Sequence, residues 1–113
     1  MQEVWQVVQA IRGWQRVAIE TDGAGLSFMV SGATLGHLRW NGRLDLPFGA
    51  ELGDRLVAEE MASRDPDQPG TGRVLFDVRR SADVDRAVWL LRLAYLTVES
   101  AMRTGTTDNA RIH

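Results

Sequence analysis

The chain of 113 residues contains no cysteine and no lysine, and each absence excludes a class of chemistry. Without cysteine there is no disulfide, no thiolate nucleophile and no zinc site with sulfur ligands. All 13 basic residues are arginine, so Schiff-base catalysis on a lysine and a phosphate loop that depends on a lysine are both excluded. A cysteine-free composition suits the reducing cytosol, and we therefore expect a cytoplasmic protein.

A large net charge and a long apolar run are also lacking. The formal net charge of −2 attracts neither nucleic acid nor an anionic membrane surface, so we expect neither as a partner. No stretch reaches the roughly 18 apolar residues that a membrane span needs. The first residues show no basic run followed by an apolar block, so we expect no secretory signal.

What the sequence does contain is a clear alternation of helical and strand-like patterns. Apolar residues at helical spacing predict helices over residues 3–12, about 50–61 and from Ser81 onward. Apolar and polar residues alternate in four further segments, which predict strands at residues 14–20, 26–30 and 73–79 and a β-hairpin within residues 35–48.

These elements predict an α+β fold, an antiparallel sheet of about five strands with two or three helices packed on one face. Between the second predicted helix and the last predicted strand, residues 63–72 hold two prolines, two glycines and no apolar side chain. We therefore expect an irregular loop there. We expect a single domain over residues 1–103 and a flexible C-terminal tail over residues 104–113.

The last helix is the strongest structural signal. Its apolar residues repeat at spacings of four and three, and further apolar residues widen the stripe to most of the circumference: Val84, Val88, Leu91, Tyr95, Val98 and Met102, then Trp89, Leu90, Leu93 and Leu96. We expect Trp89 to belong to the core. A helix that is apolar nearly all round needs cover on more than one side. The other helices or a second copy of the protein must therefore cover what the sheet does not, and a homodimer through residues 84–102 is one expectation.

The predicted hairpin has two possible registers. A two-residue turn at Asn41-Gly42 pairs Leu38 with Asp45, and it mixes apolar and charged side chains on both faces. A three-residue loop, Trp40-Asn41-Gly42, with Gly42 in the left-handed conformation, pairs Leu38 with Leu44 and His37 with Asp45. We prefer the second register because it places apolar side chains on one face of the hairpin and charged side chains on the other. Its weak point is that Arg39 and Arg43 lie opposite each other.

Under this register, one face of the sheet meets the helices and the other is polar. The helix-facing residues are predicted to be Leu26, Phe28, Val30, Leu38, Leu44, Leu46, Val74, Phe76 and Val78. The polar face would carry Ser27, Met29, His37, Arg39, Arg43, Asp45, Leu75, Asp77 and Arg79. An antiparallel sheet with one solvated face shows this pattern whether or not it has a function.

The polar face nevertheless contains the one set of ionisable groups that the pattern brings together. We predict His37 and Asp45 as catalytic residues, with the carboxylate raising the pKa of the imidazole and fixing its tautomer. Ligand-binding residues are predicted at five further positions: Arg39, Trp40, Arg43, Asp77 and Arg79. The arginines suit a carboxylate or a phosphate-like group, and an exposed Trp40 would offer a surface for a flat ligand. One internal histidine with scattered acids gives no metal-ligand spacing, so we expect no metal and no cofactor.

Three stretches carry a family resemblance: residues 36–48, which begin Gly-His-Leu and end Asp-Leu-Pro-Phe, residues 54–58, and residues 81–96. Over residues 10–97 the chain resembles the luciferase-like domain family, whose members are small, mostly uncharacterised proteins that are frequent in actinobacteria. The lysine-free composition fits such a source. The family name does not imply light emission.

The chain departs from this family at several positions. Members commonly carry His-x-His where this chain has His37-Leu38-Arg39, and often a His-His pair where it has residues 64–67. The tryptophan that typically opens the last strand is replaced by Arg73. Of the histidines that would serve a metal or a proton relay, only His37 is present. A histidine-based family site would therefore be mostly lost here, or this member does something different.

Two functions follow from these observations. The first is a small-molecule-binding domain, with the ligand on the polar face or between the sheet and the long helix. Any catalysis would be cofactor-independent, with His37 as general acid or base and Asp45 orienting it. The alternative is a non-catalytic module for protein interaction or homodimerisation.

Overall fold

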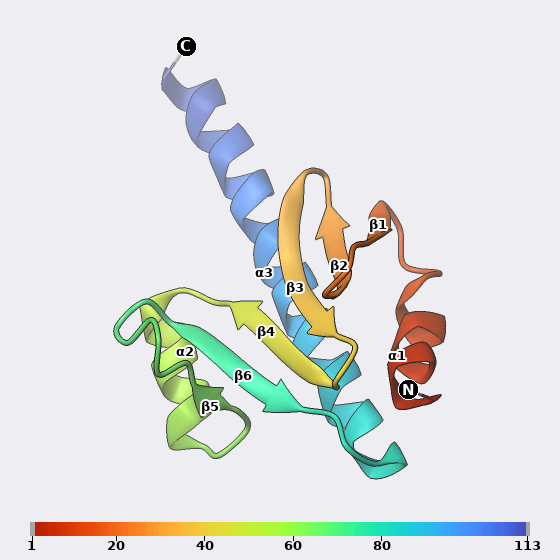
Figure 1. The fold of residues 1–113 in the computed structure, drawn as a ribbon. Helices are drawn as coiled ribbons and strands as arrows, with labels where there is room; N and C mark the ends of the chain where they lie inside the picture. Colours follow the sequence, from red (N-terminus) through yellow and green to blue (C-terminus); the bar gives the residue numbers. More distant parts are fainter. Residues whose placement is uncertain (1, 113) are drawn as a thin grey trace.

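The computed structural model describes the backbone of residues 2–112 and the side chains of residues 2–103. Within this part of the chain, six strands form one antiparallel sheet in the order β1-β2-β3-β4-β6-β5 (Figure 1). The strands are β1 (Val17–Thr21), β2 (Gly25–Val30), β3 (Ala33–Arg39), β4 (Arg43–Pro47), β5 (Ser63–Arg64) and β6 (Arg73–Asp77). The predicted α+β class is confirmed. The strand beyond the expected five is β5, which pairs with β6 where the sequence predicted only a loop.

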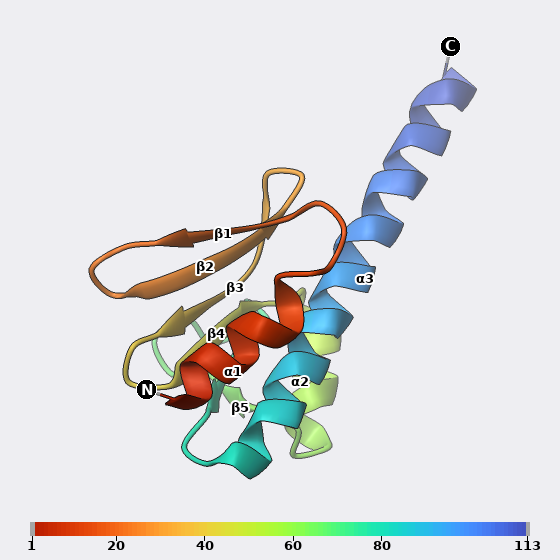
Figure 2. The same cartoon turned by 90° about the vertical axis from the view of Figure 1, so that its right-hand side faces the viewer.

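Three helices accompany the sheet in the described part of the chain: α1 (Gln2–Ile11), α2 (Ala50–Ala58) and α3 (Ser81–Ile112). Helix α3 lies behind the sheet in Figure 1 and contacts β3 and β4. Helix α1 packs beside α3, and α2 packs against β5 and β6 (Figure 2). The far face of the sheet, which carries the predicted polar residues, is turned toward the viewer in Figure 1.

The core lies between the sheet and α3. Eight of the nine residues predicted to face the helices are buried: Leu26, Phe28, Val30, Leu38, Leu44, Leu46, Val74 and Val78. The ninth, Phe76, is half-buried and packs against this core. Gly36 on β3 permits the close approach of α3, because a Cβ there would lie 3.1 Å from a methyl carbon of Leu91 and 3.0 Å from the Asp45 carbonyl oxygen.

A β-bulge between β2 and β3 adds a core residue that strict alternation does not predict. The register shifts between Phe28 and Met29, which pair with Gly36 and Thr34. Leu35 is the extra residue on β3, and its side chain is fully buried. A bulge places two residues of one strand opposite one of its partner, so the period of two is interrupted there.

The expectation that Trp89 belongs to the core is wrong, because its side chain is 46% exposed. The buried stripe of α3 runs through Ala87, Leu91 and Ala94. Successive residues of an α-helix are about 100° apart, so Trp89 lies roughly opposite this stripe.

Helix α3 continues in the backbone to Ile112. The side chains of residues 104–112, and residue 113 altogether, lie outside the described part of the chain. The flexibility expected of residues 104–113 therefore stays a prediction. At the other end of the helix, the Asp83 carboxylate accepts hydrogen bonds from the backbone N–H groups of Arg79 and Arg80, and these bonds lower its pKa.

Candidate functional site

The β3–β4 hairpin has the predicted three-residue loop, the one that separates apolar from charged side chains. Leu38 pairs with Leu44 and His37 with Asp45, and Trp40-Asn41-Gly42 connects the two strands. Gly42 has a φ of +95°, and its N–H donates to the Arg39 carbonyl oxygen at 2.9 Å. A Cβ on Gly42 would collide with the Val78 carbonyl oxygen, so only glycine fits both the conformation and the space.

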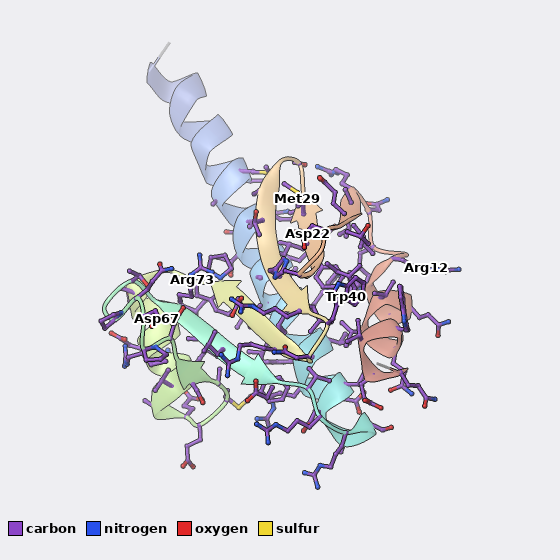
Figure 3. All side chains as sticks on the ribbon, in the orientation of Figure 1. Arg12, Asp22, Met29, Trp40, Asp67 and Arg73 are labelled. Carbon is purple, nitrogen blue, oxygen red and sulfur yellow. The ribbon has the colours of Figure 1, made fainter. Side chains whose placement is uncertain are left out.

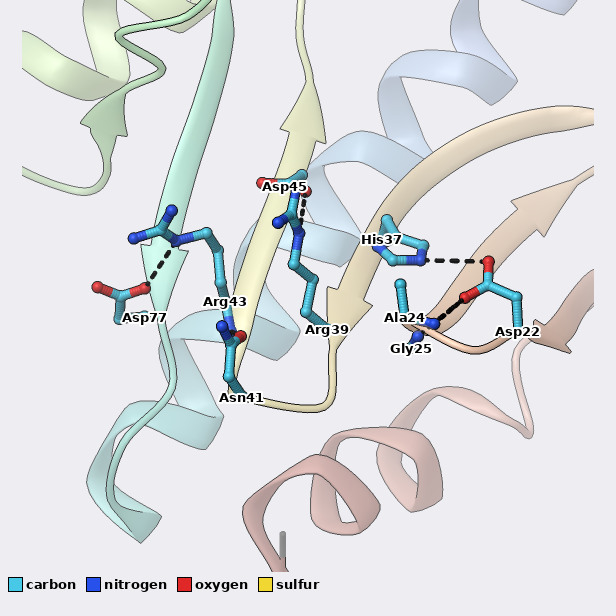
Figure 4. Close-up of polar contacts among 9 residues, drawn as sticks. All are labelled: Asp22, Ala24, Gly25, His37, Arg39, Asn41, Arg43, Asp45 and Asp77. Carbon is cyan, nitrogen blue, oxygen red and sulfur yellow. Dashed lines mark hydrogen bonds and ion pairs between the residues drawn. The ribbon is translucent and has the colours of Figure 1, made fainter.

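This register carries one row of residues across the polar face. Consecutive pairings join residues on five strands in the order Ser27, His37, Asp45, Leu75 and Ser63. A second row nearer the hairpin loop contains Arg39 and, through the pairing of β4 with β6, Arg43 and Asp77. Figure 3 shows the side chains of this face, and Figure 4 shows the polar contacts among them.

The His37 imidazole lies beside Asp22, which follows β1, and the two form an ion pair when the imidazole is protonated. The imidazole Nε2 lies 3.6 Å from the Asp22 Oδ2, and the imidazole is 23% exposed (Figure 4). The other Asp22 oxygen accepts the N–H groups of Ala24 and Gly25 at 2.8 and 2.9 Å. These two backbone bonds, with a smaller contribution from His37, lower the pKa of Asp22. The sequence placed Asp22 only in a turn, and no local signal connected it with a histidine fifteen positions away.

Asp45, which the sequence assigned to His37, is held by Arg39. The Arg39 Nε donates to the Asp45 Oδ2 at 3.3 Å, and the Asp45 side chain is only 9% exposed (Figure 4). His37 and Asp45 face each other in the register, but the ion pairs join each of them to a different neighbour. A nearly buried carboxylate requires a cationic partner, and Arg39 provides it.

The two arginines that flank the loop avoid each other because each has its own acid. Arg39 pairs with Asp45, and the Arg43 Nε lies 3.5 Å from the Asp77 Oδ1 on β6. The second Asp77 oxygen lies 3.4 Å from an Nη of Arg79. Of the predicted ligand-binding residues, Arg39, Arg43, Asp77 and Arg79 therefore form two neighbouring ionic clusters.

Trp40 lies apart from these clusters. Its ring is half-buried and packs against Trp5 of α1, with the ring centroids 6.0 Å apart and the planes inclined by 45°. This contact fixes the end of the hairpin to α1.

A shallow groove borders the polar face beside the Arg43–Asp77 pair. Its volume is about 480 Å³, and it is lined by Arg43, Ser63, Arg64, Pro66, Leu75, Phe76 and Asp77. Arg64 reaches across to Asp54 of α2. Leu75 and Pro66 give the groove an apolar part, and its two arginines, Arg43 and Arg64, are each paired with an aspartate.

The arginines of the face keep hydrogen-bonding capacity. Arg39 and Arg43 each use Nε for their carboxylate, and among the described side chains no hydrogen bond involves their Nη atoms. Both side chains are about half exposed, at 50% and 46%. A guanidinium anchored through one nitrogen can still offer a fork of N–H donors to a carboxylate.

Two other kinds of feature are absent from the described residues. No group of three or more histidine and acidic side chains there has the geometry to hold a metal ion. No described helix has the length and apolar character to cross a membrane.

A family model named the Luciferase domain matches residues 32–94. The chain belongs to this family. The matched stretch extends from the start of β3 into α3, and it contains both ionic clusters and His37 but not Asp22. No curated protein and no solved structure matches the chain.

Proposed function

We propose that the polar face of this luciferase-like domain binds a small organic anion. The observation that carries the proposal is the anchoring of Arg43 through Nε to Asp77 in the lining of a groove of about 480 Å³, with Arg39 anchored in the same way to Asp45 next to it on the polar face. Anchored guanidinium groups lose less rotamer entropy on binding a carboxylate than free ones do. Leu75 and Pro66 would contact the apolar part of the ligand.

Any reaction on this face would be cofactor-independent, with His37 as the group that moves a proton. The Asp22 carboxylate lies 3.6 Å from its Nε2 atom and would favour one orientation of the ring. Asp45 would act as a positioning residue, because its carboxylate fixes Arg39. Arg39 and Arg43 would stabilise negative charge that develops on the ligand. The cysteine-free composition supports a cytoplasmic location for this activity.

The test is a titration of the ¹⁵N-labelled protein with benzoate, followed by NMR, with benzyl alcohol as the neutral probe. We expect saturable shifts of β3, β4 and β6 amides with benzoate alone. Arg43→Ala should weaken benzoate binding by about ten- to a hundredfold, since a charge-assisted hydrogen bond contributes roughly 1.5–3 kcal/mol. The matched control is Arg55→Ala, which removes an exposed arginine from an ion pair on α2.

Two outcomes would contradict the proposal. The first is equal binding of the acid and the alcohol, and the second is an absence of saturable shifts on the polar face. In the second case, the alternative of a non-catalytic interaction module would be favoured. For the proton-transfer role, the His37 imidazole resonances should respond to benzoate in the wild type but not in Arg39→Ala/Arg43→Ala.

A further inference from the structure

The outward side of α3 exposes an apolar stripe. Trp89 is 46% and Leu96 is 48% exposed, and Leu93 is half-buried between them. These residues follow one another at spacings of four and three, so they lie along one side of the helix. That side is opposite the buried stripe of Leu91 and Ala94. Large apolar side chains gathered on one exposed face mark an interaction surface.

We propose that a second copy of this chain covers the stripe, with α3 packed antiparallel against α3 of the partner around a two-fold axis near Leu93. In that arrangement Trp89 contacts Leu96 of the partner subunit, and Leu96 contacts Trp89 of the partner subunit. A two-fold interface is self-complementary in this way. The same contact between a large and a smaller apolar side chain occurs twice, once on each side of the axis. A parallel pairing would instead place Trp89 against its own copy.

The charges along the stripe favour the antiparallel direction. Asp85 lies four residues before Trp89, and Arg103 lies seven residues after Leu96, on the same side of the helix. The antiparallel pairing brings Asp85 of each copy within one helical turn of Arg103 of the partner subunit. A parallel pairing would bring Asp85 close to Asp85 and Arg103 close to Arg103, which is unfavourable.

Arg92 is the arginine nearest the proposed two-fold axis, and its guanidinium group does not point toward the axis. Two copies of Arg92 would approach each other beside Leu93 if the side chains extended outward. In the structure the Arg92 guanidinium instead lies over the rings of Trp14 and Tyr95, 5.0 and 4.7 Å from their centroids. Cation–π contacts of this kind hold the charge against the protein's own aromatic rings.

The pairing would leave the polar face open. Helix α3 lies on the other side of the sheet from the Arg39 and Arg43 clusters, as Figures 1 and 4 show. The second copy would therefore add a helical layer behind the sheet without covering the groove beside Arg43. Self-association and anion binding are independent, and either can fail without the other.

Sedimentation velocity at micromolar concentration tests the assembly. We expect a dimer for the wild type, and Trp89→Ala should raise its dissociation constant by at least about tenfold, as truncation of a buried aromatic hot spot does. The matched control is Trp5→Ala, because Trp5 is exposed to a similar extent, at 49%, but lies on α1. A monomeric wild type overturns the proposal, including a monomer that associates with lipid vesicles. A dimer that Trp89→Ala does not weaken also overturns it.

Single cysteines test the direction of pairing, since the chain has no cysteine of its own. Leu93→Cys should form a disulfide-linked dimer on mild oxidation, because the residue lies at the axis. Ser100→Cys should not form this disulfide. Its two copies would be fourteen residues apart along the helices, about 21 Å, whereas a disulfide joins Cα atoms less than about 7 Å apart. Efficient cross-linking of Ser100→Cys would show a parallel pair and would overturn the antiparallel arrangement.

Discussion

The two faces of the β3–β4 hairpin use alternate residues of the same strands, yet different forces hold them. On the helix-facing side Leu38 and Leu44 are fully buried against the core, where packing is tight. On the other side Arg39 and Arg43 are half exposed and reach their aspartates at 3.3 and 3.5 Å. An exposed ion pair such as Arg43–Asp77 contributes at most about 1 kcal/mol, whereas the Asp45 carboxylate of the other pair is only 9% exposed. Most of the stability of the fold therefore comes from the helix-facing side, while the other side keeps guanidinium N–H groups available to a ligand.

The largest effect should come from the helix-facing side. Leu44→Ala is expected to lower the free energy of unfolding by about 2–5 kcal/mol, because it removes a fully buried side chain and leaves a cavity. Arg43→Ala, the next residue on the same strand but facing the other way, should change it by less than about 0.5 kcal/mol. Urea denaturation measures both. An equal loss of unfolding free energy in the two variants would show that the two faces contribute equally to stability.

The loop that sets the register should be nearly as sensitive. Gly42→Ala is expected to cost about 1–3 kcal/mol, because φ is +95° and the added Cβ collides with the Val78 carbonyl oxygen. The control is Gly23→Ala in the β1–β2 turn, where a Cβ meets nothing within 4 Å. Thermal and urea unfolding compare the two variants. An unperturbed Gly42→Ala would mean that the loop does not hold the faces in their register.

A smaller effect is expected from the polar side itself. Arg39→Ala should destabilise the protein by about 1 kcal/mol, because it leaves the nearly buried Asp45 carboxylate without its cation. Asp45→Asn in the same background should recover part of this loss, since a neutral amide is less costly to bury. Urea denaturation of the single and double variants gives the coupling between the two side chains. A double variant no more stable than Arg39→Ala would show that the pair is not coupled.

The smallest effect should be the pH dependence at Asp22. Its folded-state pKa lies below the ordinary value of 3.8, chiefly because of the N–H bonds from Ala24 and Gly25. A depressed carboxyl pKa adds stability above the unfolded pKa, and this contribution is lost as pH falls through the folded pKa. The difference in unfolding free energy between wild type and Asp22→Asn should therefore shrink on acidification from about pH 6 to about pH 2. Asp67→Asn serves as the control, and the same change with pH in both variants would contradict the assignment.

The fold class and the hairpin register were predictable because they depend on local periodicity. Alternating residues separated the core from the polar side, and only a three-residue loop at Gly42 kept Leu38 opposite Leu44. The strand β5 was missed because two polar residues carry no pattern. The core position of Leu35 was missed because a bulge interrupts the alternation.

The ionic partners were less predictable than the strands. The sequence paired His37 with Asp45 by register, whereas the structure joins His37 to Asp22 and Asp45 to Arg39. Register fixes which Cα atoms face each other, but long side chains choose among several neighbours within reach. The β1–β2 turn brings Asp22 to the imidazole, and nothing in the local pattern around either residue encodes that approach.

The sequence by itself determined most of the residues on the core side of the sheet. The reason is that a strand alternates its side chains with a period of two, and the apolar residues of these strands follow that period. It therefore defined the sheet, its core side and the polar character of the opposite side. Tertiary structure alone decided the ion-pair partners and the exposure of Trp89. Both depend on how neighbouring elements are oriented in three dimensions, and the chain specifies that orientation only through the packing of the whole core.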